Sequence, residues 1–184
     1  SWSVMILGCA QHGRGLLCFD FFDRMVKDDV MATSVTILGI LKACVTLGSL
    51  EHGRLIHAQV LESGFEQNIP IGSALVDMYA KCQSIEDARK SFNLLPEKNI
   101  VLWCAMMWGY VDQGQGPASL DLLEKMPEEN LKPNDVTFLC ALKACESCGS
   151  IVPVRLVHEL IVKSGFELDT VIGSAAIDMY TIYG

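Results

Sequence analysis

The apolar positions of this chain follow a helical period almost throughout. In the first segment they fall at Trp2, Met5, Ile6 and Cys9, and glycine or proline interrupts the chain between one such segment and the next. This spacing places apolar side chains on one face of a helix. No stretch shows the two-residue alternation of a half-buried strand. The pattern therefore predicts an all-α chain.

The predicted helices form pairs joined by short connections. They cover residues 1–13 with 16–27, 35–46 with 50–63, 69–81 with 84–95, 101–111 with 117–126 and 136–147 with 151–164, and residues 171–183 form one more. Gly64 suits a left-handed helix end, from which Phe65 can pack back on the helix. Ser84 with Asp87 predicts a side-chain cap at a helix start.

The same pattern recurs over long range. VTILGILKACVTLGSLEHGRLIHAQVLESGF begins at Val35, and VTFLCALKACESCGSIVPVRLVHELIVKSGF begins at Val136, an offset of 101 residues (136 − 35). Aligned on one another, the helical pairs start near residues 34, 69, 100, 135 and 170. One pair cannot bury its apolar face alone, so the units are expected to stack into an α-solenoid, a superhelix with a concave groove.

Composition agrees with a packed helical array. Hydrophobic residues make up 51% and charged residues 20% of the 184 positions, enough apolar material for a continuous core and too little charge for disorder. No apolar run approaches the roughly 20 residues that span a bilayer, so no membrane contact is predicted. The chain begins at Ser1 without a signal or transit segment, and we expect it to be part of a longer protein.

The placement of the cysteines indicates the redox compartment, and the net charge bears on the class of binding partner. Five of the eight cysteines lie among apolar residues in helical patterns, where they behave as small hydrophobes, which favours a reducing compartment over a disulfide framework. The net charge is −8, which taken alone disfavours nucleic acid, because phosphate contacts need Lys and Arg. A scaffold that binds protein partners therefore stays open as an alternative.

Several runs resemble the plant pentatricopeptide repeat (PPR) family. They are LKAC, LGSLEHGRLIHAQVLESGF, GSALVDMYAKC, SIEDARKSFNLLPEKN, AMMWGYVDQGQG, LDLLEKM and KPN. Their unequal lengths are similar to the subclass that alternates standard, long and short motifs. On that resemblance the chain is one repeat array: standard 1–33, long 34–68, short 69–99, standard 100–134, long 135–169, and the first helix of a short motif at 170–184.

The resemblance implies sequence-specific binding of single-stranded RNA in a mitochondrion or chloroplast, about one base per repeat. It implies an adaptor for organellar RNA processing such as cytidine-to-uridine editing, with editing-complex proteins as further partners. No enzyme activity, cofactor, metal or small-molecule substrate is expected in this chain.

The resemblance also names base-reading residues, the fifth and the last of each motif. They are Ser3 with Thr33, Leu38 with Asn68, Ser73 with Asn99, Cys104 with Asn134, Leu139 with Asp169, and Ser174 alone.

The base-reading pairs differ in how closely they match the family pattern. Ser73 with Asn99 fits the family pattern that selects adenine. Leu38 and Leu139 are apolar and are expected to read little. Cys104 departs from the usual Asn, Thr or Ser, and Thr33 departs from the usual Asp or Asn.

Other chemistry-bearing residues have a packing interpretation. Cys145 and Cys148 form a C-x-x-C, but no second pair lies at zinc-ligand spacing, and the position equivalent to Cys148 holds Leu47. His57 and His158 are equivalent copies on second helices and are expected to pack against the neighbouring unit. Asp77 and Asp178 likewise recur and have no paired carboxylate, so hydrogen bonding is favoured over acid–base catalysis.

Overall fold

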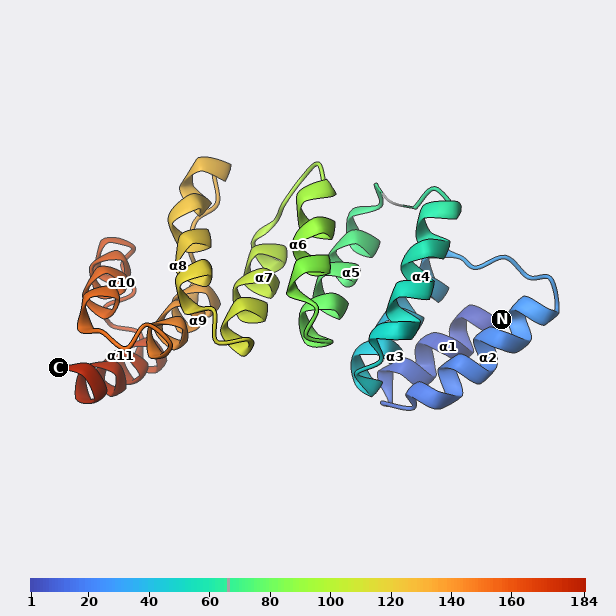
Figure 1. Ribbon diagram of the computed structural model, residues 1–184, viewed down its shortest axis with the longest axis horizontal. Helices are drawn as coiled ribbons and strands as arrows, with labels where there is room; N and C mark the ends of the chain where they lie inside the picture. Colours follow the sequence, from blue (N-terminus) through green and yellow to red (C-terminus); the bar gives the residue numbers. More distant parts are fainter. Residues whose placement is uncertain (66) are drawn as a thin grey trace. The chain divides into compact units, whose positions relative to one another are not determined.

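The computed structural model describes residues 1–65 and 67–184, and this part of the chain contains helices and no strands (Figure 1). The helices are α1 (Trp2–Gln11), α2 (Gly15–Lys27), α3 (Ser34–Leu47), α4 (Leu50–Glu62), α5 (Ile69–Lys81), α6 (Ile85–Leu94), α7 (Ile100–Asp112), α8 (Gly116–Lys125), the 3-10 turn η1 (Met126–Glu129), α9 (Asp135–Glu146), α10 (Ile151–Lys163) and α11 (Thr170–Tyr183). The predicted all-α fold and its helical pairs are confirmed.

The ends of the helices follow from local chemistry. Gly64 and Gly165 take left-handed backbone angles, with φ of 70° and 79°. After each glycine the phenylalanine N–H turns back to a carbonyl of the helix, Phe65 to Val60 at 3.0 Å and Phe166 to Ile161 at 3.1 Å. These bonds satisfy carbonyls that the helix end leaves free. The predicted left-handed ends are therefore present in both copies.

Ser84 is the N-cap of α6, so the predicted helix start is correct, but the predicted side-chain hydrogen bond to the helix is absent. Ser84 Oγ donates to Asp87 Oδ2 at 2.9 Å, and no backbone N–H of α6 is capped by Ser84. The same carboxylate oxygen accepts from Arg54 Nη2 of α4 at 2.8 Å. Hydrogen bonding to Arg54 lowers the pKa of Asp87. Asp87 Oδ2 thus accepts from both the Ser84 hydroxyl and the Arg54 guanidinium.

The chain forms two compact units, Ser1–Glu97 and Lys98–Gly184. In the first unit α1, α3 and α5 are the first helices of their hairpins, and α3 contacts both α1 and α5. The second helices α2 and α4 pack against the first helix of the next hairpin, α3 and α5 respectively. The first helices thus form one layer and the second helices lie outside it, the arrangement of an α-solenoid.

The second unit repeats this packing. Helix α9 contacts α7, α8, α10 and α11, so α7, α9 and α11 form the layer of first helices. Its core equivalents match across the 101-residue offset: Ile37, Leu41 and Cys44 of α3 correspond to Phe138, Leu142 and Cys145 of α9, and all six side chains are buried.

All eight cysteines are free thiols, and five are buried as small apolar side chains. Among the described residues no helix combines the length and apolar character that crossing a lipid bilayer requires.

Candidate nucleic-acid interface

The predicted base-reading residues occupy two structural positions. Each fifth residue lies on a first helix: Ser3 on α1, Leu38 on α3, Ser73 on α5, Cys104 on α7, Leu139 on α9 and Ser174 on α11. Each last residue is the N-cap of the next first helix: Thr33 of α3, Asn68 of α5, Asn99 of α7, Asn134 of α9 and Asp169 of α11. The order of the motifs therefore places one capping side chain before each of these five helices.

In the last residues that are Asn or Asp, capping fixes which side-chain atom remains available. The Oδ1 atom accepts a backbone N–H from Ile71 at 3.1 Å in Asn68 and from Leu102 at 2.9 Å in Asn99. An asparagine whose Oδ1 is held in this way presents its Nδ2 group, a donor. Asp169 Oδ1 accepts two backbone N–H groups at 2.9 Å, which leaves Oδ2, an acceptor.

The structure brings the first pair together. Ser3 Oγ lies 3.2 Å from Thr33 Oγ1 and 2.9 Å from Thr36 Oγ1. Thr36 is fully buried and forms a capping box with Thr33. The three hydroxyl groups satisfy one another, so any ligand here would have to compete with these internal hydrogen bonds.

The equivalent site on the second unit is joined through a buried threonine. Cys104 Sγ lies 3.5 Å from Thr137 Oγ1, which donates to Asn134 Oδ1 at 2.8 Å. The Asn134 backbone N–H donates back to Thr137 Oγ1 at 3.3 Å, completing a capping box. Burial raises the pKa of Cys104, whose side chain is 8% exposed. Cys104 is therefore a buried, uncharged thiol that is linked to Asn134 through the Thr137 hydroxyl.

The remaining fifth residues offer less hydrogen bonding. Leu38 and Leu139 are half-buried and apolar. Ser174 Oγ donates to the Thr170 carbonyl one turn earlier at 2.8 Å. Ser73 Oγ is buried and has no hydrogen-bond partner in the part of the chain that the structure describes.

Two further pairs of residues at this surface were missed by sequence reasoning. Thr36 and Thr137 connect the fifth residue of one motif with the last, and the signal for them was the hydroxyl three residues after each cap. Lys42 and Lys143 follow Leu38 and Leu139 by four residues, so each shares a helix face with a fifth residue. Both lysines are exposed.

The histidine copies hydrogen-bond to the neighbouring helix, as predicted. His57 Nδ1 of α4 lies 2.9 Å from the Tyr79 hydroxyl of α5, and the two rings meet edge to face. His158 of α10 and Tyr180 of α11 repeat the pair at 3.0 Å. Burial lowers the pKa of His57, with Asp87 opposing that shift, and burial raises the pKa of Tyr79 to about 12.

The lowered pKa of His57 predicts a pH-dependent stability. The unfolded chain takes up the proton near pH 6.5 and the folded chain only at lower pH, so stability is expected to fall as pH drops through that range. His57→Gln keeps a hydrogen-bonding group beside Tyr79 and removes the titration. Its melting temperature should fall less than that of the parent between pH 7.5 and pH 5.5.

His158→Gln is the matched control for loss of the histidine–tyrosine bond, because His158 is exposed. An equal fall in melting temperature for His57→Gln and the parent would contradict this prediction.

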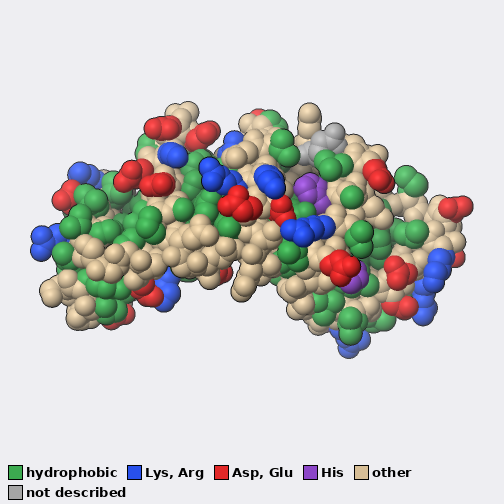
Figure 2. Space-filling model, viewed as in Figure 1, with side chains coloured by type: hydrophobic (Ala, Val, Ile, Leu, Met, Phe, Trp, Pro, Cys, Tyr) green, Lys and Arg blue, Asp and Glu red, His purple; other side chains and the backbone are tan. Residues whose placement is uncertain are grey.

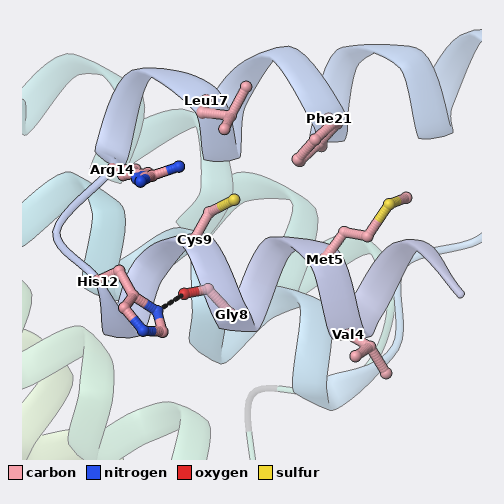
Figure 3. A pocket seen from close by; sticks show the side chains of 8 residues that line it. All are labelled: Val4, Met5, Gly8, Cys9, His12, Arg14, Leu17 and Phe21. Carbon is pink, nitrogen blue, oxygen red and sulfur yellow. Dashed lines mark hydrogen bonds between the residues drawn. The ribbon is translucent and has the colours of Figure 1, made fainter.

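A cavity of about 420 Å³ lies on the α1–α2 hairpin (Figure 3). Its wall includes Leu17 and Phe21, and no carboxylate lines it. The His12 imidazole donates from Nδ1 to the Gly8 carbonyl at 2.8 Å. Cys9 and Arg14 lie on the same cavity wall as His12.

The cysteines of the C-x-x-C pair are placed as packing residues. Cys145 Sγ donates to the Ala141 carbonyl at 3.2 Å, and Cys148 Sγ donates to the Ala144 carbonyl at 3.6 Å. Burial raises the pKa of Cys145 to about 12. Zinc binds the thiolate, so this environment opposes metal binding.

We therefore expect no stoichiometric zinc in protein purified without chelator, measured by atomic absorption. Cys148→Ser should leave the metal content and the melting temperature nearly unchanged. One tightly held zinc per chain, lost in that variant, would show that the packing interpretation is wrong.

Two family models match this chain, the PPR repeat over residues 1–30 and the PPR repeat family over residues 98–146. A pentatricopeptide repeat-containing protein of Arabidopsis thaliana is 38% identical over 184 residues, which is all of this chain and 25% of the relative. The chain belongs to the PPR repeat family.

Other PPR relatives carry organelle names. A chloroplastic PPR protein of Arabidopsis thaliana is 34% identical over 184 residues, covering 100% of this chain and 30% of the relative. A mitochondrial one is 34% identical over 150 residues, covering 82% and 27%. The chain thus spans about a quarter to a third of the length of these relatives.

Solved structures share the fold. The PPR protein PPR10, in complex with an 18-nucleotide psaJ RNA element, has a TM-score of 0.78 at 18% identity, covering 98% of this chain and 28% of that one. Nuclear proteinaceous RNase P 2 of Arabidopsis thaliana has a TM-score of 0.75 at 10% identity, covering 97% and 41%. These likenesses support the helical-repeat solenoid.

Proposed function

We propose that this segment binds single-stranded RNA in a sequence-specific way, with each hairpin facing about one base, as an adaptor for organellar RNA processing. The base-reading residues are the eleven named above. One observation carries the proposal: the last residue of each of five motifs is a side-chain N-cap, and in the four that are Asn or Asp the cap commits one polar atom and leaves another for a partner. The PPR10–RNA complex supports RNA as that partner.

Charge along the first helices supports phosphate contacts at the long motifs. Lys42 and Lys143 lie one turn after the fifth residue of the two long motifs, whereas Asp77 and Asp178 take that place in the short ones. Asp77 forms an ion pair with Lys81 at 3.0 Å, and Lys143 forms one with Glu146 at 2.7 Å, so a phosphate at Lys143 would compete with that carboxylate. We infer that the phosphates are met mainly at the long motifs, which lets a chain of net charge −8 bind RNA.

Editing and localisation rest on the family resemblance. We place the whole protein in a mitochondrion or chloroplast, since relatives are named for both. We assign it to an editing complex with protein partners, while this segment supplies RNA recognition and no catalysis. The alternating standard, long and short motifs, as bounded above, belong to the same proposal.

A titration with labelled RNA tests the binding. Fluorescence anisotropy should show tighter binding of single-stranded RNA than of duplex RNA, and weaker binding as salt rises from about 50 to 200 mM. Lys42→Gln with Lys143→Gln should reduce both the affinity and the salt slope. Lys163→Gln, on the second helix α10, is the matched control and should change neither.

The net charge of −8 favours one other function, a scaffold for protein partners. Equal, salt-independent binding of single-stranded and duplex RNA, or no binding at low salt, would support the scaffold and overturn the RNA proposal.

A further inference from the structure

A groove of about 460 Å³ lies on the second unit, lined by α8, α10 and the turn that joins α9 to α10. Its apolar walls are formed mainly by Leu120, Leu123, Pro153, Leu156 and Leu160. Leu156 is 53% exposed and Leu160 is 36% exposed. In Figure 2 hydrophobic side chains gather over the α8–α10 region, with acidic ones beside them. The groove is distinct from the surface that carries the base-reading residues, which lie on first helices and at their caps.

The two copies of the repeat explain why this groove is open. At the positions 101 residues earlier, Phe19 is the equivalent of Leu120 and His52 is the equivalent of Pro153. Their rings contact each other in a tilted arrangement with centroids 4.4 Å apart. The first-copy equivalent of Cys148 is Leu47. Its side chain packs on Gly15, where an added Cβ would lie 2.7 Å from Leu47 Cγ. The second copy therefore has smaller side chains at three positions that are filled in the first.

The substitutions also make the groove more apolar and leave its charge unbalanced. Leu160 replaces Gln59 of the first copy. Asp121 and Glu124 line the groove, and its lining includes no Lys, Arg or His. Neither carboxylate forms an ion pair within the described residues, whereas Asp20, the equivalent of Asp121, pairs with Arg24 at 3.0 Å. An occupant must therefore supply both apolar side chains and positive charge.

We propose that the α8–α10 groove docks an amphipathic helix of a protein partner, with apolar residues four apart and a Lys or Arg facing Asp121 and Glu124. A helix laid between two helices fits this surface, because the described elements offer no sheet edge for strand addition. RNA is disfavoured, since the two carboxylates repel phosphate. The attraction between the partner's cation and the two carboxylates sets the orientation of the helix. The leucines that become buried on binding supply the affinity.

Three matched peptides test the chemistry. The first is an alanine-rich helix of about 16 residues with two leucines four apart and flanking lysines. The second replaces its lysines by glutamates, and the third replaces its leucines by glutamines. By fluorescence anisotropy only the lysine–leucine peptide should bind the protein, and it should lose affinity on Asp121→Asn with Glu124→Gln. The equivalent change in the first copy, Asp20→Asn with Asp23→Asn, is the control and should have no effect.

Substitutions that fill the groove test whether the peptide binds there. Leu120→Phe, Cys148→Leu and Pro153→His together install the first copy's residues, which the fold accommodates there. Peptide affinity should fall about tenfold or more, the effect of losing one buried leucine-sized contact. The proposal is overturned if the lysine peptide does not bind, if the glutamate peptide binds equally, or if filling has no effect.

Other occupants give their own results. An unchanged peptide affinity with weakened RNA binding in the filled variant would assign the groove to RNA. A change of oligomeric state in sedimentation would assign it to a second copy of the chain, and either result overturns the proposal.

Discussion

Asn99→Asp is expected to turn the base preference of the short motif 69–99 from adenine to guanine. In the structure Asn99 Oδ1 is held by the Leu102 N–H, so the outward group is the Nδ2 donor. The ring nitrogen on the pairing edge of adenine accepts a hydrogen bond, whereas that of guanine donates one. An aspartate that caps in the same way presents an acceptor, as Asp169 does in front of α11.

The substitution should leave the fold intact, because Asp and Asn cap helices about equally well. A mismatched partner should cost about 1–3 kcal/mol, roughly 5- to 150-fold in affinity. The measurement is binding of RNAs that differ only at the base opposite this motif, in protein that keeps its natural flanking repeats.

Ser73→Ala is the companion variant, because Ser73 is the other predicted base-reading residue of this motif. Asn99→Ala removes the cap as well as the donor and should weaken binding without inverting the preference. If the parent protein shows no purine preference there, or if the ranking survives Asn99→Asp, the assignment of Ser73 and Asn99 is wrong.

Phe138→Ala is expected to be the most damaging single truncation in the second unit. Phe138 is fully buried on α9, and its ring meets Phe166 edge to face with centroids 5.4 Å apart. Truncating a buried phenylalanine removes transfer free energy and leaves a cavity, at a cost of about 3–5 kcal/mol. The free energy of unfolding can be followed by urea titration in a Trp2→Phe background, so that the fluorescence comes from Trp103 and Trp108 of α7.

Phe138→Leu is the matched control, because it keeps most of the volume and should cost less. Phe166→Ala should also cost less, since Phe166 is half-buried. A loss below about 1 kcal/mol for Phe138→Ala would contradict the view that this ring is central to the core of the unit.

The helices and their pairing were predictable because they depend on periodic apolar positions and on local end signals. The 101-residue recurrence identified equivalent core residues such as Cys44 and Cys145 before any packing was known. The side-chain bond expected at Ser84 is absent, and its hydroxyl instead shares the Asp87 carboxylate with Arg54, which lies 33 residues before Asp87. A local sequence pattern carries no information on partners that are distant in the sequence, such as Arg54, and these partners also determine which hydrogen bonds a capping side chain makes.

Part of the candidate site could also be predicted. Ser3 and Thr33 were paired from the resemblance, and their hydroxyls meet at 3.2 Å. The role of Thr137 was not predicted, because it depends on the rotamers that let one hydroxyl contact both Cys104 and Asn134. The α8–α10 groove was not predicted for a similar reason. It arises from the side-chain volumes at Leu120 and Pro153 and not from a change in the pattern of apolar and polar positions.

The proposed second role of the capping residues, in base reading, bears on how such a chain can evolve. A helix start accepts Asn, Asp, Ser and Thr at little difference in stability. The last residue of each motif is drawn from this small set, Thr33, Asn68, Asn99, Asn134 and Asp169. On the proposed function, a single substitution within the set changes the target sequence without unfolding the protein. Recognition can then drift one base at a time among stable intermediates, and new targets need no compensating mutation elsewhere.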